Sequence, residues 1–320
     1  MSKNAQDFID LAALSPDALR ALLDVAHARK AARVGYPKAQ ADADAPLQNY
    51  MLAMVFDKPS TRTRLSFDLA MRQLGGNTMI INRDDTHLHR GESLSDTAQV
   101  VSRFADIAML RTGAHENLAK FAATADIPVI NGLTAHSHPC QIVADLMTFE
   151  EHKGRLSGQI LAWVGDGNNV AVSLIQAAAL LPFELALACP PDFMVAEKLI
   201  AGARKKGAKI TLCDTAEMAA TGASALMTDC WVSMNDNPAT AQKRQAAFAP
   251  FKVTQALMDL GDNPIFLHCL PAYRDEEVTA EVIDGAQSVV FDEAENRCHA
   301  QKAILLYCLA DNVGLADKVQ

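Results

Sequence analysis

The sequence predicts an α/β protein of two doubly wound domains, each a parallel sheet flanked by helices. Three observations predict this architecture. The chain has 320 residues, which suits two domains of ordinary size. Short apolar segments of strand length alternate with longer segments of helical period almost throughout. Polar residues follow these strands, and open α/β sheets bind their ligands at that position.

The composition is that of a soluble globular protein, with 50% hydrophobic and 21% charged residues. A net charge of −9 and a pI near 5.5 exclude general binding to nucleic acid, which needs a basic face. The N-terminus lacks the apolar core of a signal peptide, and no apolar stretch reaches membrane-spanning length, so we expect no membrane partner. The seven cysteines are odd in number and include no C-x-x-C pair, which indicates a reducing, cytoplasmic compartment.

The first domain is expected to span residues 1–148. Ser15, followed by proline, is an N-cap signal for a helix that runs to about Ala32. Further helices are expected over 65–74, before a Gly-Gly pair, and over 138–152. The strands of this domain are expected in the apolar runs at 51–56, 78–81, 107–110 and 127–130.

The second domain is expected to span residues 149–320, because residues 151–158 have the most linker-like composition in the chain. Its strands are expected at 160–164, 185–188, 210–213, 225–228, 265–267 and 288–291. Together with the first domain this makes ten expected strands, which is many for one sheet. Residues 299–315 indicate a last helix, and the stretch 300–320 is able to pack back on the first domain.

Seven polar clusters follow the expected strands, after Phe56, Leu110, Ile130, Val164, Thr228, Leu267 and Phe291. The first cluster, P-S-T-R-T-R (59–64), places hydroxyls and cations at the start of a helix. The free N–H groups and positive dipole end of a helix favour an anion there. Arg62 is expected to contact a phosphate directly, because a planar guanidinium matches phosphate geometry. Arg64 is expected to brace the helix and the loop around it.

A simpler interpretation is that Ser60 only caps a helix whose arginines are solvated. Arg111, His138 and Arg297, each expected near a neighbouring strand end, favour the anion site instead.

The turn G-D-G-N-N-V (165–170) resembles a dinucleotide fingerprint only in part. Val170 stands where a third small residue is needed, and no acidic residue ends the following strand at Ala188. We therefore expect a polar turn in which the side chain of Asn168 or Asn169 meets a substrate.

Two other patterns are compatible with different chemistry. His136 and His138 form an H-x-H after a strand, which can be a metal pair, but no carboxylate-rich cluster supplies further ligands. His268 and Cys269 are adjacent on a strand and therefore point to opposite faces, which makes them a poor nucleophilic pair. Cys269 is expected to contact or orient a substrate, or to be a buried inert thiol.

Three motifs in order carry a family resemblance. S-T-R-T-R (60–64), H-P-C-Q (138–141) and H-C-L-P (268–271) resemble the aspartate/ornithine carbamoyltransferases over about residues 15 to 310. H-C-L-P together with D-C-W-V-S-M (229–234) is similar to the ornithine branch, since the aspartate branch would carry proline in place of Cys269.

The resemblance implies a carbamoyl-phosphate domain, an amino-acid domain that closes over it with the active site in the cleft between them, and a homotrimer with active sites at subunit interfaces. It implies transfer of the carbamoyl group of carbamoyl phosphate to the δ-amino group of L-ornithine, giving L-citrulline and phosphate in arginine metabolism. No metal and no organic cofactor is implied. The implied catalytic residues are Arg111, His138, Asp229 and Cys269. The implied carbamoyl-phosphate site consists of Ser60, Thr61, Arg62, Thr63, Arg111, His138, Gln141, Cys269, Leu270 and Arg297. The implied ornithine site consists of Asn169, Asp229, Ser233 and Met234.

Two positions depart from the family pattern. Asn235 stands where the family usually has glycine after Ser-Met, and asparagine is the most tolerant substitute for a glycine conformation. In H-L-H-R-G-E-S (87–93), which matches a loop that reaches into a neighbouring subunit, His87 replaces an expected glutamine and Arg90 keeps a cation. The alternatives are a carbamoyltransferase for putrescine or an N-acylated ornithine, a non-catalytic relative that binds carbamoyl phosphate, and a metal-dependent hydrolase built on H-S-H.

Overall fold

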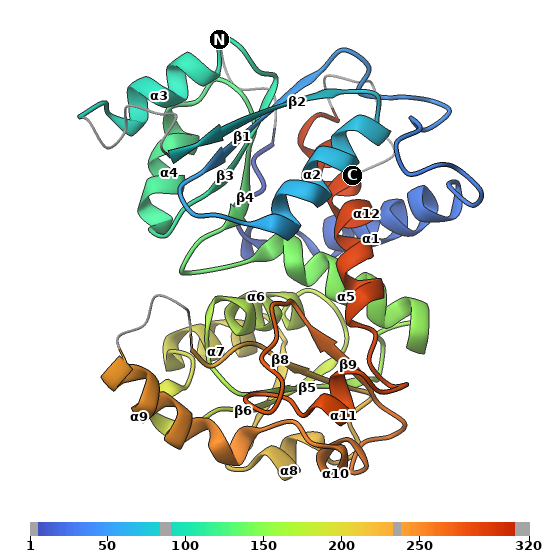
Figure 1. The fold of residues 1–320 in the computed structure, drawn as a ribbon, viewed down its shortest axis with the longest axis vertical. Helices are drawn as coiled ribbons and strands as arrows, with labels where there is room; N and C mark the ends of the chain where they lie inside the picture. The colour runs from blue at the N-terminus through green and yellow to red at the C-terminus, as the bar shows by residue number, and fades with distance from the viewer. Residues whose placement is uncertain (1–5, 84–90, 233–237, 311–320) are drawn as a thin grey trace. The chain divides into compact units, whose positions relative to one another are not determined.

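The computed structural model describes residues 6–83, 91–232 and 238–310. The chain divides into two units, one formed by Met1–Ala144 with Glu295–Gln320 and the other by Asp145–Ala294. Each unit is a parallel sheet with helices on its faces (Figure 1), so the predicted α/β class is confirmed. In the part of the chain that the structure describes, no helix is both long and apolar enough to cross a membrane.

The sheet of the first unit has four parallel strands in the order β2-β1-β3-β4. The strands are β1 (Met51–Phe56), β2 (Asn77–Asn82), β3 (Ile107–Arg111) and β4 (Val129–Leu133). The helices of this unit are η1 (Leu11–Ala13), α1 (Pro16–Ala31), α2 (Thr61–Gln73), α3 (Leu94–Val101) and α4 (His115–Thr124). Phe56 pairs with Arg111, so β1 and β3 end side by side and deliver their following residues to one edge.

The sheet of the second unit has five parallel strands in the order β7-β6-β5-β8-β9. The strands are β5 (Ile160–Val164), β6 (Glu184–Ala188), β7 (Lys209–Leu212), β8 (Ala225–Thr228) and β9 (Ile265–His268). The helices between and after these strands are α6 (Asn169–Ala178), η4 (Pro191–Phe193), α7 (Glu197–Lys205), α8 (Ala216–Ala220), α9 (Pro238–Phe248), η5 (Ala249–Phe251), α10 (Gln255–Met258) and α11 (Ala280–Ile283).

Two long helices complete the chain: α5 (Pro139–Lys153) and α12 (Val290–Cys308). Each contains one of the two points where the chain passes between the units, so α5 from Asp145 and α12 up to Ala294 belong to the second unit.

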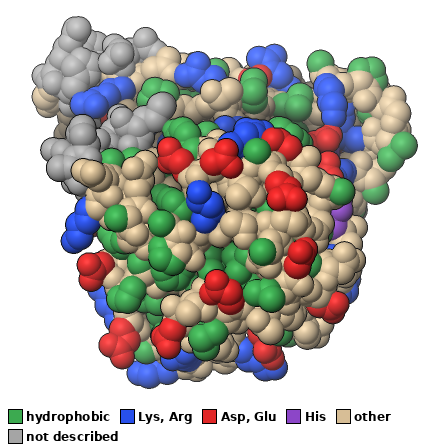
Figure 2. All heavy atoms as spheres, turned by 60° about the horizontal axis from the view of Figure 1, so that its bottom comes forward, with side chains coloured by type: hydrophobic (Ala, Val, Ile, Leu, Met, Phe, Trp, Pro, Cys, Tyr) green, Lys and Arg blue, Asp and Glu red, His purple; other side chains and the backbone are tan. Residues whose placement is uncertain are grey.

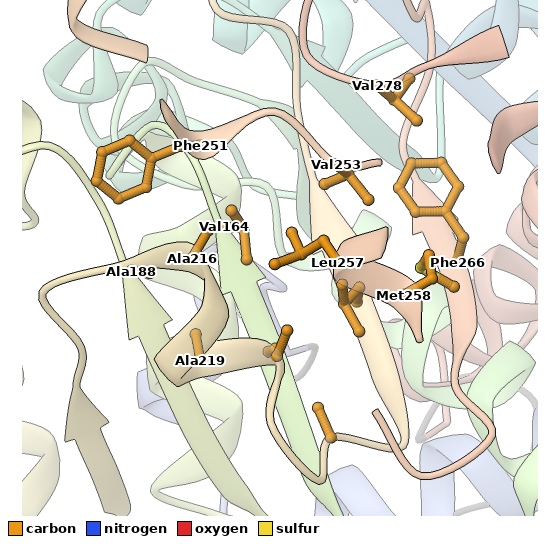
Figure 3. Close-up of a cluster of buried hydrophobic side chains, with 14 of the residues drawn as sticks. Val164, Ala188, Ala216, Ala219, Phe251, Val253, Leu257, Met258, Phe266 and Val278 are labelled. Carbon is orange, nitrogen blue, oxygen red and sulfur yellow. The ribbon is translucent and has the colours of Figure 1, made fainter. Parts of the chain in front are cut away.

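Apolar side chains fill both faces of each sheet, as expected for parallel sheets covered by helices. Figure 3 shows part of the cluster in the second unit, where Val164 of β5 and Phe266 of β9 face Leu257 and Met258 of α10. The first unit has a corresponding cluster that includes Val55 of β1. Burial of this apolar surface drives folding at roughly 25 cal/mol per Å². On the face shown in Figure 2, acidic and basic side chains are interspersed between apolar ones.

One expected strand is wrong. Residues 288–291 form no strand: Ser288 makes an isolated bridge to Phe266, and α12 begins at Val290. A run of four apolar residues is short enough to fit either a strand or the start of a buried helix, and here the helix forms. The described residues therefore contain nine strands instead of ten. Arg297 consequently lies within α12 and does not follow a strand end.

Candidate functional site

The start of α2 in the first unit carries the first group of predicted site residues. Ser60 has an extended backbone and caps the helix, its hydroxyl accepting a hydrogen bond from the Thr63 N–H at 3.3 Å. Thr61 is exposed and Arg62 half-buried at this helix end. The cap and the first-turn N–H groups make this end a favourable place for an anion.

Arg64 has a different environment. Its guanidinium donates a hydrogen bond to the Asn82 side chain of β2 and lies 5.3 Å from the ring centroid of Phe56 at the end of β1. Arg64 therefore holds the start of α2 against these two strands.

The hydroxyl of Thr63 joins residues from three elements. Its Oγ1 atom accepts hydrogen bonds from Arg111 Nη1 at 3.1 Å and from Arg297 Nη2 at 3.0 Å. Arg297 Nη1 also donates to Gln141 Oε1 at 3.0 Å. Thr63, Gln141 and Arg297 are all buried. The end of β3, the start of α5 and the middle of α12 thus bring two guanidinium groups to the first turn of α2.

His138 lies directly before α5 and is buried. Its backbone carbonyl accepts from the Gln141 N–H at 3.1 Å, which holds it at the helix start. Burial, together with the positive charges of Arg297, Arg111 and Arg62, lowers the pKa of His138 well below its ordinary 6.5. The imidazole is therefore neutral at physiological pH and offers one N–H donor and one acceptor. Arginines next to a neutral imidazole suit a ligand that has both an anionic group, for the guanidinium groups, and an uncharged oxygen that accepts a hydrogen bond.

Asp229 is the centre of the polar group in the second unit, directly after β8. Its Oδ1 atom accepts hydrogen bonds from the Cys230 N–H at 2.8 Å and from the Cys269 thiol at 3.1 Å. Its Oδ2 atom accepts from Asn168 Nδ2 at 2.7 Å. Three neighbours thus hold this nearly buried carboxylate in one orientation.

Asn168 is the residue of the polar turn that contacts Asp229. Its Oδ1 atom also caps α6 by accepting from the N–H groups of Val170 and Ala171, at 2.9 and 3.3 Å. Asn169 is the first residue of α6, and its carbonyl accepts from the Ser173 hydroxyl at 3.1 Å. The sequence left the choice between the two asparagines open because adjacent residues at a helix start are equivalent in pattern.

Cys269 follows β9 and acts as a hydrogen-bond donor to Asp229. Burial first, and then the negative charge of Asp229, raises the pKa of this thiol well above its ordinary range. A thiol that stays protonated is a poor nucleophile. The geometry therefore favours a residue that orients its neighbours over one that forms a covalent intermediate.

His268, the last residue of β9, braces the loop that follows. Its Nδ1 atom accepts from the Leu270 N–H at 2.9 Å, so Nε2 carries the ring proton and donates to Glu277 Oε1 at 3.2 Å. Glu277 is fully buried and also accepts from the Tyr273 N–H at 2.6 Å. This network supports Leu270, whose φ of 56° lies in the left-handed region that non-glycine residues rarely adopt. Sequence reasoning missed Glu277, because nothing local links it to His268.

Asp229, His268 and Cys269 each place a possible metal-ligand atom within 4.8 Å of the others. Both ring nitrogens of His268 already have hydrogen-bond partners, and Cys269 keeps its proton, so the group fits a hydrogen-bond network better than a metal site. The other candidate pair, His136 and His138, is split: the ring of His136 packs on His115 at 4.9 Å, whereas His138 lies among arginines.

Several predicted residues lie outside the described residues. They are His87, Arg90, Ser233, Met234 and Asn235.

Comparison with known families gives two matches that together span nearly the whole chain. Residues 6–151 match the aspartate/ornithine carbamoyltransferase carbamoyl-P binding domain. Residues 157–308 match the aspartate/ornithine carbamoyltransferase Asp/Orn binding domain.

Individual proteins give the same result. The ornithine carbamoyltransferase of Caulobacter vibrioides is 51% identical over 302 residues, covering 94% of this chain and 96% of that protein. The ornithine carbamoyltransferase of Rhodopseudomonas palustris is 51% identical over 311 residues, covering 97% and 98%. Among solved structures, the Pyrococcus furiosus ornithine carbamoyltransferase matches with a TM-score of 0.89 at 40% identity, covering 97% of this chain and 99% of that one.

Proposed function

This chain belongs to the aspartate/ornithine carbamoyltransferase family, and we propose that it transfers the carbamoyl group of carbamoyl phosphate to the δ-amino group of L-ornithine. The products are L-citrulline and phosphate. The observation that carries the proposal is the buried, neutral His138 surrounded by Arg62, Arg111 and Arg297. Such a group suits carbamoyl phosphate, which combines a dianionic phosphate with a carbonyl.

The first unit supplies the groups for carbamoyl phosphate. Arg62, with the hydroxyls and N–H groups at the start of α2, binds the phosphate and stabilises it as it leaves. Arg111 and His138 donate hydrogen bonds to the carbonyl oxygen, on which negative charge develops. Each such donor is worth about 2.7–4 kcal/mol in comparable sites. Gln141 and Arg297 complete the site through their mutual contact.

The second unit supplies the groups for ornithine. A carboxylate has about four acceptor sites, and hydrogen bonds from the described residues occupy three of those on Asp229. The remaining site on Oδ2 suits the α-ammonium group of ornithine. We also propose that Asn169, Ser233 and Met234 bind ornithine, and that Cys269 and Leu270 lie beside the reacting carbon.

The reaction forms one bond and breaks one. The lone pair of the neutral δ-amine attacks the carbonyl carbon, the bond from that carbon to the phosphate oxygen breaks, and phosphate leaves with the electron pair. The amine loses one proton, which the departing phosphate can accept. Because free ornithine is mostly protonated at neutral pH, the site must select the neutral amine.

The nearest alternative substrates are putrescine and an N-acylated ornithine. An acylated α-nitrogen carries no positive charge for Asp229 to bind, so Asp229 favours ornithine over that substrate. Putrescine keeps an ammonium group, and only an assay separates it from ornithine.

The assay offers carbamoyl phosphate with ornithine, N-acetylornithine, putrescine or aspartate and follows both phosphate release and the carbamoylated product. We expect the highest kcat/KM with ornithine. Absence of turnover with ornithine contradicts the proposal. Faster turnover with putrescine identifies putrescine as the substrate instead. Binding of carbamoyl phosphate without turnover of any amine identifies a non-catalytic relative.

We further propose that the protein is a cytoplasmic homotrimer that acts in arginine biosynthesis. Apolar side chains exposed on α2 and the edge strand β2 support a subunit contact: Leu65, Met79 and Ile80 are 65%, 40% and 38% exposed. The seven free cysteines support a reducing compartment. Sedimentation velocity should give about three times the 34.4 kDa chain mass; a monomer or dimer contradicts this assembly.

A further inference from the structure

Helix α12 carries a second cation, Lys302, that is fully buried in the first unit. Its Nζ atom lies 2.9 Å from both carboxylate oxygens of Asp42. The next residues along the helix are Ala303, Ile304, Leu305 and Leu306, and all are buried. A buried ammonium group costs several kcal/mol to desolvate, and apolar residues often replace buried ion pairs without loss of stability. Stability alone therefore does not account for Lys302.

Asp42 has two further cationic partners. Its carboxylate accepts from Arg33 Nη1 at 2.6 Å and from Arg29 Nη1 at 3.4 Å. Arg29 also forms a two-point contact with Asp44 at 2.7 and 2.8 Å. Asp42 therefore keeps a charge partner even when the ammonium group of Lys302 is removed.

Asp42 also connects α12 to the far end of α2. The Asp42 N–H donates to the carbonyl of Gln73, the last residue of α2, at 2.6 Å. The Cys298 thiol of α12 contacts Gln73 Oε1 at 3.7 Å. At its first turn, α2 contacts α12 through Thr63 and Arg297. The two helices, both visible in the first unit in Figure 1, are thus joined near both ends of α2.

The two anchored residues of α12 are five positions apart. This separation corresponds to about 7.5 Å along the helix axis and about 140° around it. Contacts at two heights and on two sides of a helix oppose both sliding and rotation. A helix held in this way delivers the Arg297 guanidinium to Thr63 and Gln141 in one position.

We propose that Lys302 is a positioning residue that acts through Asp42 to fix α12 and so hold Arg297 in the carbamoyl-phosphate site. This inference rests on the proposed function. Displacement of a substrate-positioning group by 1 Å can lower activity by about 100-fold, so a buried pair distant from the substrate can affect the geometry of the site.

The test variant is Lys302→Met, which keeps the apolar stem and removes only the ammonium group. Because Arg33 and Arg29 still contact Asp42, we expect the variant to fold, which thermal unfolding checks. Calorimetry with carbamoyl phosphate should show Kd raised about tenfold, within the usual range of coupling between residues in one network. Lys302→Gln keeps a hydrogen-bond donor toward Asp42 and should raise Kd by a smaller factor. If the Met variant does not fold, the Gln variant provides the test instead.

Lys38→Met is the matched control. Lys38 contacts Glu295, on the same helix and two residues before Arg297, at 2.7 Å, but this pair is exposed. Exposed pairs contribute little, so Kd should change less than about twofold. An equal rise in Kd for Lys38→Met and Lys302→Met overturns the proposal, because loss of any positive charge near α12 would then be enough to weaken binding.

The decisive measurement repeats Lys302→Met in an Arg297→Gln background. If Lys302 acts through Arg297, the Lys302→Met substitution should change Kd by less than about twofold in the Arg297→Gln background. Each of the two substitutions should still alter thermal unfolding. A full tenfold effect in that background overturns the proposal, as does an unchanged Kd in Lys302→Met alone. Failure of the unmodified protein to bind carbamoyl phosphate contradicts the proposed function itself.

Discussion

At the scale of single residues, similar side chains near α2 have different roles because their surroundings differ. Arg62 lies at the helix start and contributes to the low pKa of His138, whereas Arg64 contacts Asn82 and Phe56. Arg72, on the same helix, forms an exposed pair with Asp68 at 2.9 Å. The sequence predicted a phosphate contact for Arg62 and a bracing role for Arg64, and the contacts of Arg64 and Arg72 show what holds each of these two side chains.

Arg62→Ala should weaken binding of carbamoyl phosphate by about 100-fold. The substitution removes a charged, two-point contact to phosphate, and each hydrogen bond to a charged group is worth about 1.5–3 kcal/mol. The control Arg72→Ala removes an exposed ion pair worth about 0.5 kcal/mol and should leave Kd unchanged. Titration calorimetry on both variants checks this, and a similar Kd for the two would remove Arg62 from the phosphate site.

At the scale of elements, caps place the site residues. Ser60 caps α2 and Asn168 caps α6, so each helix start is both a structural terminus and a polar surface. Ser15 caps α1 in the same way, accepting from the Ala18 N–H at 3.1 Å, without a proposed role in binding. Two caps of one type in one unit allow the structural contribution to be separated from the functional one.

Ser60→Ala and Ser15→Ala should each lower the free energy of unfolding by about 1 kcal/mol, because each removes one capping hydrogen bond. Only Ser60→Ala should raise Kd for carbamoyl phosphate, by about tenfold, since its hydroxyl is a proposed phosphate donor. Denaturant unfolding and calorimetry on the pair measure the two effects. If Ser15→Ala raises Kd equally, the binding effect is a general consequence of destabilisation.

At the scale of the whole molecule, buried neutral imidazoles link stability to pH. Burial lowers the pKa of His299 to about 3 and that of His138 well below 6.5. Both groups stay neutral in the folded protein, whereas in the unfolded chain they take up protons below pH 6.5. The unfolded state then binds more protons, so stability is complete above pH 6.5 and is lost as pH falls toward the folded pKa values.

The thermal unfolding midpoint should therefore decrease as the pH is lowered from 6.5 to 5. Each of the two histidines should lower the free energy of unfolding by up to about 1.4 kcal/mol per pH unit. His299→Gln removes one of these contributions. Its midpoint should decline less steeply with acid than that of the unmodified protein. A variant curve that runs parallel to the original over this range contradicts the linkage, because a merely destabilising substitution shifts the curve without changing its slope.

Local pattern was sufficient for most elements of the fold. Strands at 51–56, 160–164 and 225–228 have the expected bounds, as does the helix start after Ser60. Residues 288–291 were predicted wrongly because four apolar residues do not distinguish a strand from a buried helix start. Asn168 and Asn169 were not separated for a related reason, since a cap is identified by its contacts.

The sequence by itself determined the α/β class, the parallel strands and the edge at which polar residues gather, because strand and helix periods are local properties of the chain. It also determined the family, through three short ordered motifs. Only the tertiary structure decided which of these residues meet. Arg297 reaches Thr63 across 234 residues of chain, and Lys302 reaches Asp42 across 260. No local pattern records such pairs, because they depend on where α12 packs in the folded protein.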